Sequence, residues 1–260
     1  MTVDPGWIEA ANEAADLAGE AIRRHFRAGL IAEAKEDASP VTLADREAEA
    51  ILRGVLKRRC PDHGLTGEEM PPDDPGARHV WLIDPIDGTR AFITGRPSFC
   101  TLIALLDEGV PVLGLIDQPV TGERWIGARG AALRFQGSFG GSPGTRRGIA
   151  LREAELSCTS PEMHDPAHRA RFDRLARVTR RTYWGGDAYA YGLLALGQID
   201  VIAESSMKPW DWAALVPVIE AAGGCVTDWR GEALRQGSDG TVLALGDPAL
   251  LPEAVAALAG

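Results

Sequence analysis

The residues with the clearest chemical potential are two aspartates directly behind an apolar run. Asp84 and Asp87 lie in the sequence WLIDPIDGTRAF, residues 81–92. Removing unpaired carboxylates from water at the end of a buried strand is costly unless a cation or hydrogen-bond donors compensate. Hard divalent cations such as Mg²⁺ take oxygen ligands, whereas softer metals favour Cys or His, which this segment lacks. The segment therefore indicates a site for a hard divalent cation.

The residues around these aspartates could bind an anion as well. Pro85 interrupts a regular strand ladder, so we expect the chain to turn there, with the backbone carbonyl of Ile86 as a further oxygen ligand. Gly88 allows a close backbone approach, and its N–H and that of Thr89 could hold phosphate oxygens if a short helix begins at Thr89. An ordinary acidic turn is the alternative, because turns favour Asp, Pro and Gly.

Two further acidic elements could complete this site. Glu68 and Glu69 follow Gly67, and Asp211 lies near the start of a predicted helix. Each has a plainer explanation, because the glutamates could form a solvated loop and Asp211 could complement the helix dipole. It is their occurrence together with the 81–92 segment that favours function.

The composition limits the classes of partner. The chain has 260 residues, 45% hydrophobic and 25% charged, which is typical of a folded protein. Its formal net charge of −10 disfavours nucleic acid or an anionic membrane as a partner, because both require a dense basic surface. No apolar stretch approaches the roughly 20 residues that cross a bilayer. The N-terminus lacks the features of a secretory signal, and the cysteines are far apart, so we expect free thiols in the cytoplasm.

Periodicity predicts the elements that position these residues. Residues 5–28 and the segment from Thr42 to Pro61 predict helices, separated by a polar break at 34–40, and Thr42 and Asp45 form a capping-box pattern. In the first half the predicted strands are 79–85, two within 101–119 that are joined around 107–109, and 123–130, the last three forming a meander. An antiparallel sheet is expected here.

The second half predicts alternating helices and strands. A Gly- and Ser-rich segment, 136–148, predicts a boundary near residue 145, which divides the chain into an α+β lobe (1–145) and an α/β lobe (146–260). Beyond it we expect strand and turn at 150–160, helices at 169–181 and 188–198, a strand at 199–204 and a helix at 210–224. The fold class is therefore layered α/β, with helices covering the sheets.

Together these motifs resemble a known family. GEE (67–69), WLIDPIDGTRAF (81–92) and WDWAALVPVIEAAGG (210–224), with PVTLADREAE (40–49), resemble signatures of the inositol monophosphatase family of magnesium-dependent, lithium-sensitive phosphatases. The resemblance implies a five-layer αβαβα sandwich, a homodimer, and two or three Mg²⁺ ions. The metal ligands that it implies are Glu68, Asp84, the carbonyl of Ile86, Asp87 and Asp211.

The resemblance also implies how the reaction proceeds. Thr89, backed by Asp45, would orient a metal-bound water on the Glu68 side for attack on phosphorus. Asp45 can cap its helix and face the site as well. The substrate contacts that it implies are Asp87, Gly88, Thr89, Asp187, Glu204 and Asp211.

Longer strings favour one branch of the family. DGTRAFITGRP, LGLIDQP, ERWIGARG and KPWDWAALVP most resemble histidinol-phosphate phosphatases, which implies hydrolysis of histidinol phosphate in histidine biosynthesis. Carboxylates at Asp187 and Glu204 could hold the amine or imidazole N–H, although Asp187 could instead cap a helix and Glu204 could be a surface charge. An inositol-type or broad sugar phosphatase is the alternative, and a non-catalytic relative is a further one.

Overall fold

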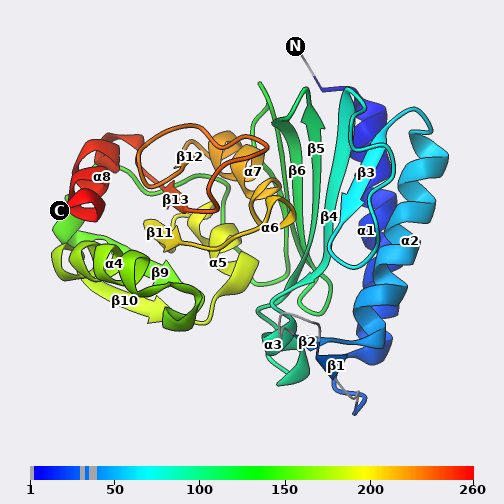
Figure 1. The fold of residues 1–260 in the computed structure, drawn as a ribbon, viewed down its shortest axis with the longest axis horizontal. Helices are drawn as coiled ribbons and strands as arrows, with labels where there is room; N and C mark the ends of the chain where they lie inside the picture. The colour runs from blue at the N-terminus through cyan, green and yellow to red at the C-terminus, as the bar shows by residue number, and fades with distance from the viewer. Residues whose placement is uncertain (1–2, 30–32, 35–39) are drawn as a thin grey trace.

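The computed structural model describes residues 3–29, 33–34 and 40–260, and its elements form five layers (Figure 1). Helices α1 (Pro5–His25) and α2 (Leu43–Arg59) cover one face of a six-stranded sheet. Three helices separate that sheet from a five-stranded sheet, and two more helices cover the far side. The predicted αβαβα sandwich is confirmed.

The outer helices begin where the sequence provides caps. The Asp4 carboxylate accepts a hydrogen bond from the Gly6 N–H, and α1 ends at His25, three residues before the predicted end. The capping box that Thr42 and Asp45 predict is present at the start of α2. The polar break predicted at 34–40 lies mostly outside the described residues.

The six-stranded sheet contains the predicted meander. Its strands, in spatial order, are β3 (Gly64–Gly67), β4 (His79–Asp87), β5 (Cys100–Asp107), β6 (Val110–Gln118), β7 (Glu123–Ala128) and β8 (Arg134–Gln136). β3 is parallel to β4 and every other pair is antiparallel. Short pieces, β1 (Glu33–Ala34), β2 (Pro40–Val41) and α3 (Thr89–Ile93), lie near the end of β4 (Figure 1).

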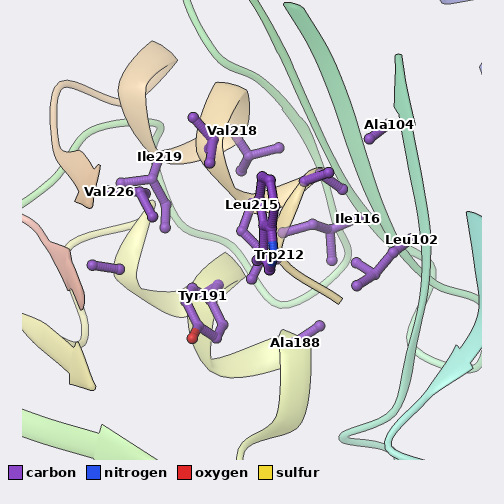
Figure 2. Packing of buried hydrophobic residues seen from close by; sticks show 14 of the residues in the cluster. Leu102, Ala104, Ile116, Ala188, Tyr191, Trp212, Leu215, Val218, Ile219 and Val226 are labelled. Atoms are coloured by element: carbon purple, nitrogen blue, oxygen red, sulfur yellow. The ribbon is translucent and has the colours of Figure 1, made fainter. Parts of the chain in front are cut away.

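The central layer differs from the prediction in two respects, because the helix predicted over 188–198 ends at Leu194 and the helix predicted over 210–224 is divided. It contains α5 (Asp187–Leu194), α6 (Pro209–Trp212) and α7 (Leu215–Ala221), whereas a single helix was predicted over 210–224. The break has a local cause: Pro217 has no N–H to donate to the carbonyl of Ala213, so α7 begins anew with this proline in its first turn. Apolar residues of this layer pack between the two sheets, as Figure 2 shows for Trp212 and Leu215.

The second sheet mixes parallel and antiparallel pairs. Its spatial order is β10 (Arg181–Trp184), β9 (Glu155–Cys158), β11 (Val201–Glu204), β13 (Val242–Leu245) and β12 (Cys225–Thr227). Helices α4 (Pro166–Val178) and α8 (Leu251–Ala259) cover its outer face, and three short 3₁₀ turns are at Leu151–Glu153, Pro161–Met163 and Pro248–Leu250. The helix predicted at 169–181 thus begins and ends three residues earlier, because its last residue belongs to β10.

The sheets divide the chain at the predicted boundary segment. The first sheet ends at residue 136 and the second begins at residue 155. Whether residues 1–145 and 146–260 are separate lobes in a functional sense stays a prediction. All four cysteines have free thiols. Among the described residues, no helix combines the length and the apolar character needed to span a membrane.

Candidate active site

The two aspartates of the 81–92 segment are brought together by a bulge rather than by a turn. Strand β4 continues through Pro85 to Asp87, but its register against β5 shifts between Asp84 and Asp87. Three residues of β4 therefore span two of β5, which is the pattern of a β-bulge. The Pro85 carbonyl accepts a hydrogen bond from Thr101 Oγ1 (2.8 Å), which holds the irregular segment in place.

Three carboxylates converge at this bulge. Ligand oxygens of Asp84, Asp87 and Asp211 all lie within 4.8 Å of one another. Backbone N–H groups orient each carboxylate: Ile86 donates to Asp84 Oδ1 (2.9 Å), Ala188 to Asp87 Oδ2 (2.6 Å) and Lys208 to Asp211 Oδ2 (2.7 Å). The donors lie on β4, α5 and the start of α6, so the group joins the first sheet to the central helices.

The electrostatics of this group favour a bound cation. Burial raises the pKa of Asp84 well above its ordinary value, and the charges of Glu68, Asp87 and Asp211 raise it further. Burial likewise raises the pKa of Asp211 to about 7, with contributions from Glu68 and Glu204. Carboxylates that repel one another in a buried place are stabilised by a divalent cation that accepts their oxygens. The residues present therefore fit a hard metal ion.

Glu68 is placed by a residue that the sequence prediction missed. It is not within the 4.8 Å group, but its charge acts on Asp84 and Asp211 from the loop after β3. The fully buried Glu49 holds this loop, because its carboxylate accepts hydrogen bonds from the N–H groups of Glu69 (2.7 Å) and Met70 (3.1 Å). The sequence signal for Glu49 was an acidic residue on the apolar face of the predicted second helix.

Asp45 caps α2 and also faces Thr89. Its Oδ2 accepts hydrogen bonds from the N–H (2.8 Å) and Oγ1 (2.6 Å) of Thr42, which caps α2. Its Oδ1 faces Thr89, whose hydroxyl lies 3.5 Å away and also 3.2 Å from the carbonyl oxygen of Ile86. Burial raises the pKa of Asp45, and the charge of Glu68 adds to this. The side chain thus connects a helix start to the acidic group.

The short helix predicted after the aspartates is present. α3 begins at Thr89, and its N-cap Gly88 has φ 86°, a left-handed conformation that glycine adopts without steric cost. A Cβ at Gly88 would contact Asp187, so the missing side chain leaves room for an acid from the other half of the chain. Ser98 Oγ donates a hydrogen bond to Asp187 Oδ2 (3.1 Å).

The two predicted substrate carboxylates are both close to the acidic group. Burial raises the pKa of Asp87, and the charge of Asp187 raises it further. The charge of Glu204 acts on Asp87, Asp187 and Asp211. Asp187 begins α5, whose N-cap residue is Gly186, so Asp187 is not itself the cap. Glu204 ends β11 and is 3% exposed, so it is not the surface charge of the alternative interpretation.

Known proteins resemble this chain over most of its length. A model of the inositol monophosphatase family matches residues 6–259. A bifunctional phosphatase of Arabidopsis thaliana, IMPL2, is 44% identical over 223 residues, which are 85% of this chain and 64% of that protein's length. The histidinol-phosphatase of Chlorobaculum parvum is 38% identical over 236 residues, covering 89% of this chain and 88% of that protein.

Solved structures agree with the sequence matches. The structure of an inositol monophosphatase from Zymomonas mobilis has a TM-score of 0.88 and 45% identity, and the match covers 97% of both chains. The resemblance that the motifs predicted is confirmed, because the matched segment includes all of the acidic elements. By fold, by sequence and by the family model, this chain belongs to the inositol monophosphatase family.

Proposed function

We propose that this protein is a Mg²⁺-dependent phosphomonoesterase that hydrolyses L-histidinol phosphate to L-histidinol and phosphate. One observation carries the choice of substrate: two carboxylates, Asp187 and Glu204, lie beside the acidic group in addition to the proposed ligands. A substrate with an amine and an imidazole supplies N–H donors for these acceptors. Histidinol-phosphatases at 35–38% identity support the same choice.

The proposed metal ligands are those that converge at the bulge. Asp84, Asp87 and Asp211 would hold two or three Mg²⁺ ions, together with Glu68 and the carbonyl of Ile86. When bound, the ions supply the positive charge that an acidic protein lacks and neutralise the phosphate oxygens during transfer. The N–H groups of Gly88 and Thr89, at the start of α3, are proposed to hold the phosphate.

Thr89 and Asp45 are proposed to position the attacking water. The Thr89 hydroxyl has one proton, which it can donate to Asp45 Oδ1 or to the Ile86 carbonyl. Its lone pairs then accept a hydrogen bond from water, which fixes the direction of attack on phosphorus. Glu68 is proposed as the carboxylate on the side of the site where this water lies.

Inositol 1-phosphate is the second candidate substrate. The supporting observation is the 45% identity to the structure of an inositol monophosphatase from Zymomonas mobilis. A polyol offers hydroxyl groups to Asp187 and Glu204 but no positive charge, so these carboxylates would gain less from it.

Comparison of phosphate esters tests the proposal. Purified protein is assayed in Mg²⁺ and in EDTA with histidinol phosphate, inositol 1-phosphate and a sugar phosphate. We expect kcat/KM to be highest for histidinol phosphate and turnover to disappear in EDTA. Preference for inositol 1-phosphate would reject the proposed substrate, and turnover in EDTA would reject the metal.

We also propose a cytoplasmic homodimer. The four free thiols support a reducing compartment, and the family resemblance supports the dimer. Light scattering of the purified protein at several concentrations tests the second point, and a mass equal to one chain would reject it.

A further inference from the structure

We propose that Tyr191 is a positioning residue that makes the site select substrates with an N–H group. It would act through Glu204, by fixing the carboxylate that receives this group. The inference rests on the proposed function and extends it, because it explains how Glu204, which forms no ion pair with an arginine or lysine among the described residues, is held in one orientation.

Two donors from different elements fix the Glu204 carboxylate. Tyr191 Oη donates to Glu204 Oε2 (2.8 Å), and the Thr159 N–H donates to Oε1 (2.7 Å). The Thr159 side chain also hydrogen-bonds to this carboxylate. Its two oxygens have four lone pairs in all, so the carboxylate retains capacity for one further donor. Glu204 and Tyr191 are 3% and 1% exposed, so water does not readily replace either donor. The carboxylate is thus oriented in advance for a substrate N–H.

Packing prevents Tyr191 from turning away. Its ring belongs to the cluster between the two sheets, and Figure 2 shows it among these apolar side chains with the hydroxyl oxygen at the edge of the drawn group. Burial and the neighbouring Glu204 raise the pKa of Tyr191 well above its ordinary value, so the phenol keeps its proton. It therefore remains a donor at neutral pH.

One helix connects both substrate carboxylates. Asp187 is the first residue of α5, and Tyr191 follows four residues later on the same helix. Asp187 faces Gly88, and Tyr191 holds Glu204. Because Glu204 also acts electrostatically on Asp187, the helix sets the relative position of two acceptors for a cationic substrate.

The chain provides a matched control on the same helix. Tyr189 Oη donates to Glu123 Oε2 (2.6 Å), and Glu123 is 2% exposed in β7. Tyr189→Phe and Tyr191→Phe are the same nearly isosteric change, each removing a hydroxyl that donates to a buried glutamate. Glu123 has no place in the acidic group, so only Tyr191→Phe should alter substrate choice.

The experiment compares KM and kcat for two esters. Histidinol phosphate carries N–H donors, whereas p-nitrophenyl phosphate does not. For Tyr191→Phe we expect KM for histidinol phosphate to rise by about tenfold, the usual effect of losing a hydrogen bond to a charged group, with kcat little changed. KM and kcat for p-nitrophenyl phosphate should stay at wild-type values, and Tyr189→Phe should resemble wild type with both esters.

A double variant tests whether Tyr191 acts through Glu204. Glu204→Gln should itself raise KM for histidinol phosphate, and adding Tyr191→Phe should then have little further effect, because the acceptor's charge is already gone. Three results would each overturn the inference. They are an equal rise in KM for both esters in Tyr191→Phe, an unchanged KM for histidinol phosphate in that variant, and additive effects on KM in the double variant. A wild-type enzyme that does not hydrolyse histidinol phosphate would instead reject the proposed function, and the inference with it.

Discussion

A Cβ atom on Gly88 would lie 2.7 Å from Cγ of Asp187, although the two residues are almost a hundred positions apart in the chain. The loop after β4 and the first residue of α5 therefore fit against each other only because Gly88 has no side chain. Asp187 has a φ of 45°, in the left-handed region that few residues other than glycine adopt. The hydrogen bond that Ser98 Oγ donates to Asp187, and the one that the Ala188 N–H donates to the Asp87 carboxylate, hold it there. The halves of the site are thus positioned by direct contact.

Gly88→Ala should separate the effect of this contact on activity from the effect of backbone strain alone. The new methyl group displaces Asp187, so we expect kcat/KM for the phosphate ester to fall by about a hundredfold, as misplacement of about 1 Å can do. Gly122→Ala is the control, because Gly122 also has positive φ (73°) but a Cβ there meets no atom within 4 Å. Gly122→Ala should lose about 1–2 kcal/mol of stability from backbone strain, and Gly88→Ala should lose more, because its methyl group also meets Asp187. Equal activity of the two variants would contradict the role of the contact.

Much of the first half could be predicted because its signals are local. Thr42 and Asp45 form the capping box that begins α2, and strand β4 shows as a continuous apolar run that ends in aspartate. The bulge at Pro85 could not be predicted in the same way. It depends on the pairing of β4 with β5, and Thr101 on that neighbouring strand holds it.

Asp84→Asn should abolish catalysis while leaving the metal-free protein at least as stable. Folding raises the pKa of Asp84, so at neutral pH its charge destabilises the folded state, and a neutral side chain removes that cost. We expect the melting temperature in EDTA to be unchanged or higher, no rise on adding Mg²⁺, and a loss in turnover of at least about a hundredfold. Asp107→Asn, in an exposed ion pair with Arg78, is the control. A wild-type response of Asp84→Asn to Mg²⁺ would exclude Asp84 as a ligand.

Thr89→Ala should lower kcat without unfolding the protein. Its hydroxyl contacts Asp45 and the Ile86 carbonyl, so we expect kcat to fall by about a hundredfold and Thr89→Ser to recover most of it. Thr42→Ala removes the hydroxyl that donates to Asp45 Oδ2 and should cost about 1 kcal/mol of stability, with little change in kcat. Stability is measured by urea unfolding and kcat by phosphate release. Loss of kcat in Thr42→Ala and not in Thr89→Ala would reverse the assignment.

Other parts of the site were outside the reach of single-sequence reasoning. Glu49 supports the loop of Glu68 through backbone N–H groups, a contact between segments about twenty residues apart that no motif records. The short strands β12 and β13 contain three and four residues, too few to show a period of two. Helix α8 was different, because the spacing of Ala254 and Leu258 was a usable signal that produced no prediction.

The buried imidazole of His164 should make stability depend on pH below neutrality. Burial, with the positive charges of Arg169 and His168, lowers the pKa of His164 from 6.5 to about 4. Between these values the unfolded chain binds more protons than the folded chain, so stability falls as pH falls. The stability that depends on a neutral His164 is fully present above pH 6.5 and is lost by about pH 4. It amounts to about 3 kcal/mol at most.

Comparison of variants separates this effect from that of the acidic group, whose raised pKa values make the folded protein more stable as pH falls. The free energy of unfolding in urea is measured at pH 7 and pH 4.5 for wild type, His164→Gln and His168→Gln. His164→Gln retains a hydrogen-bonding group for Ser205, which lies 2.8 Å from Nδ1, but does not titrate. It should lose less stability than wild type between the two pH values. His168→Gln removes only one of the charges that lower the pKa of His164, so its loss should lie between those of wild type and His164→Gln. Parallel losses in His164→Gln and wild type would mean that His164 is protonated in the folded protein, because only a histidine that stays neutral there can oppose folding in acid.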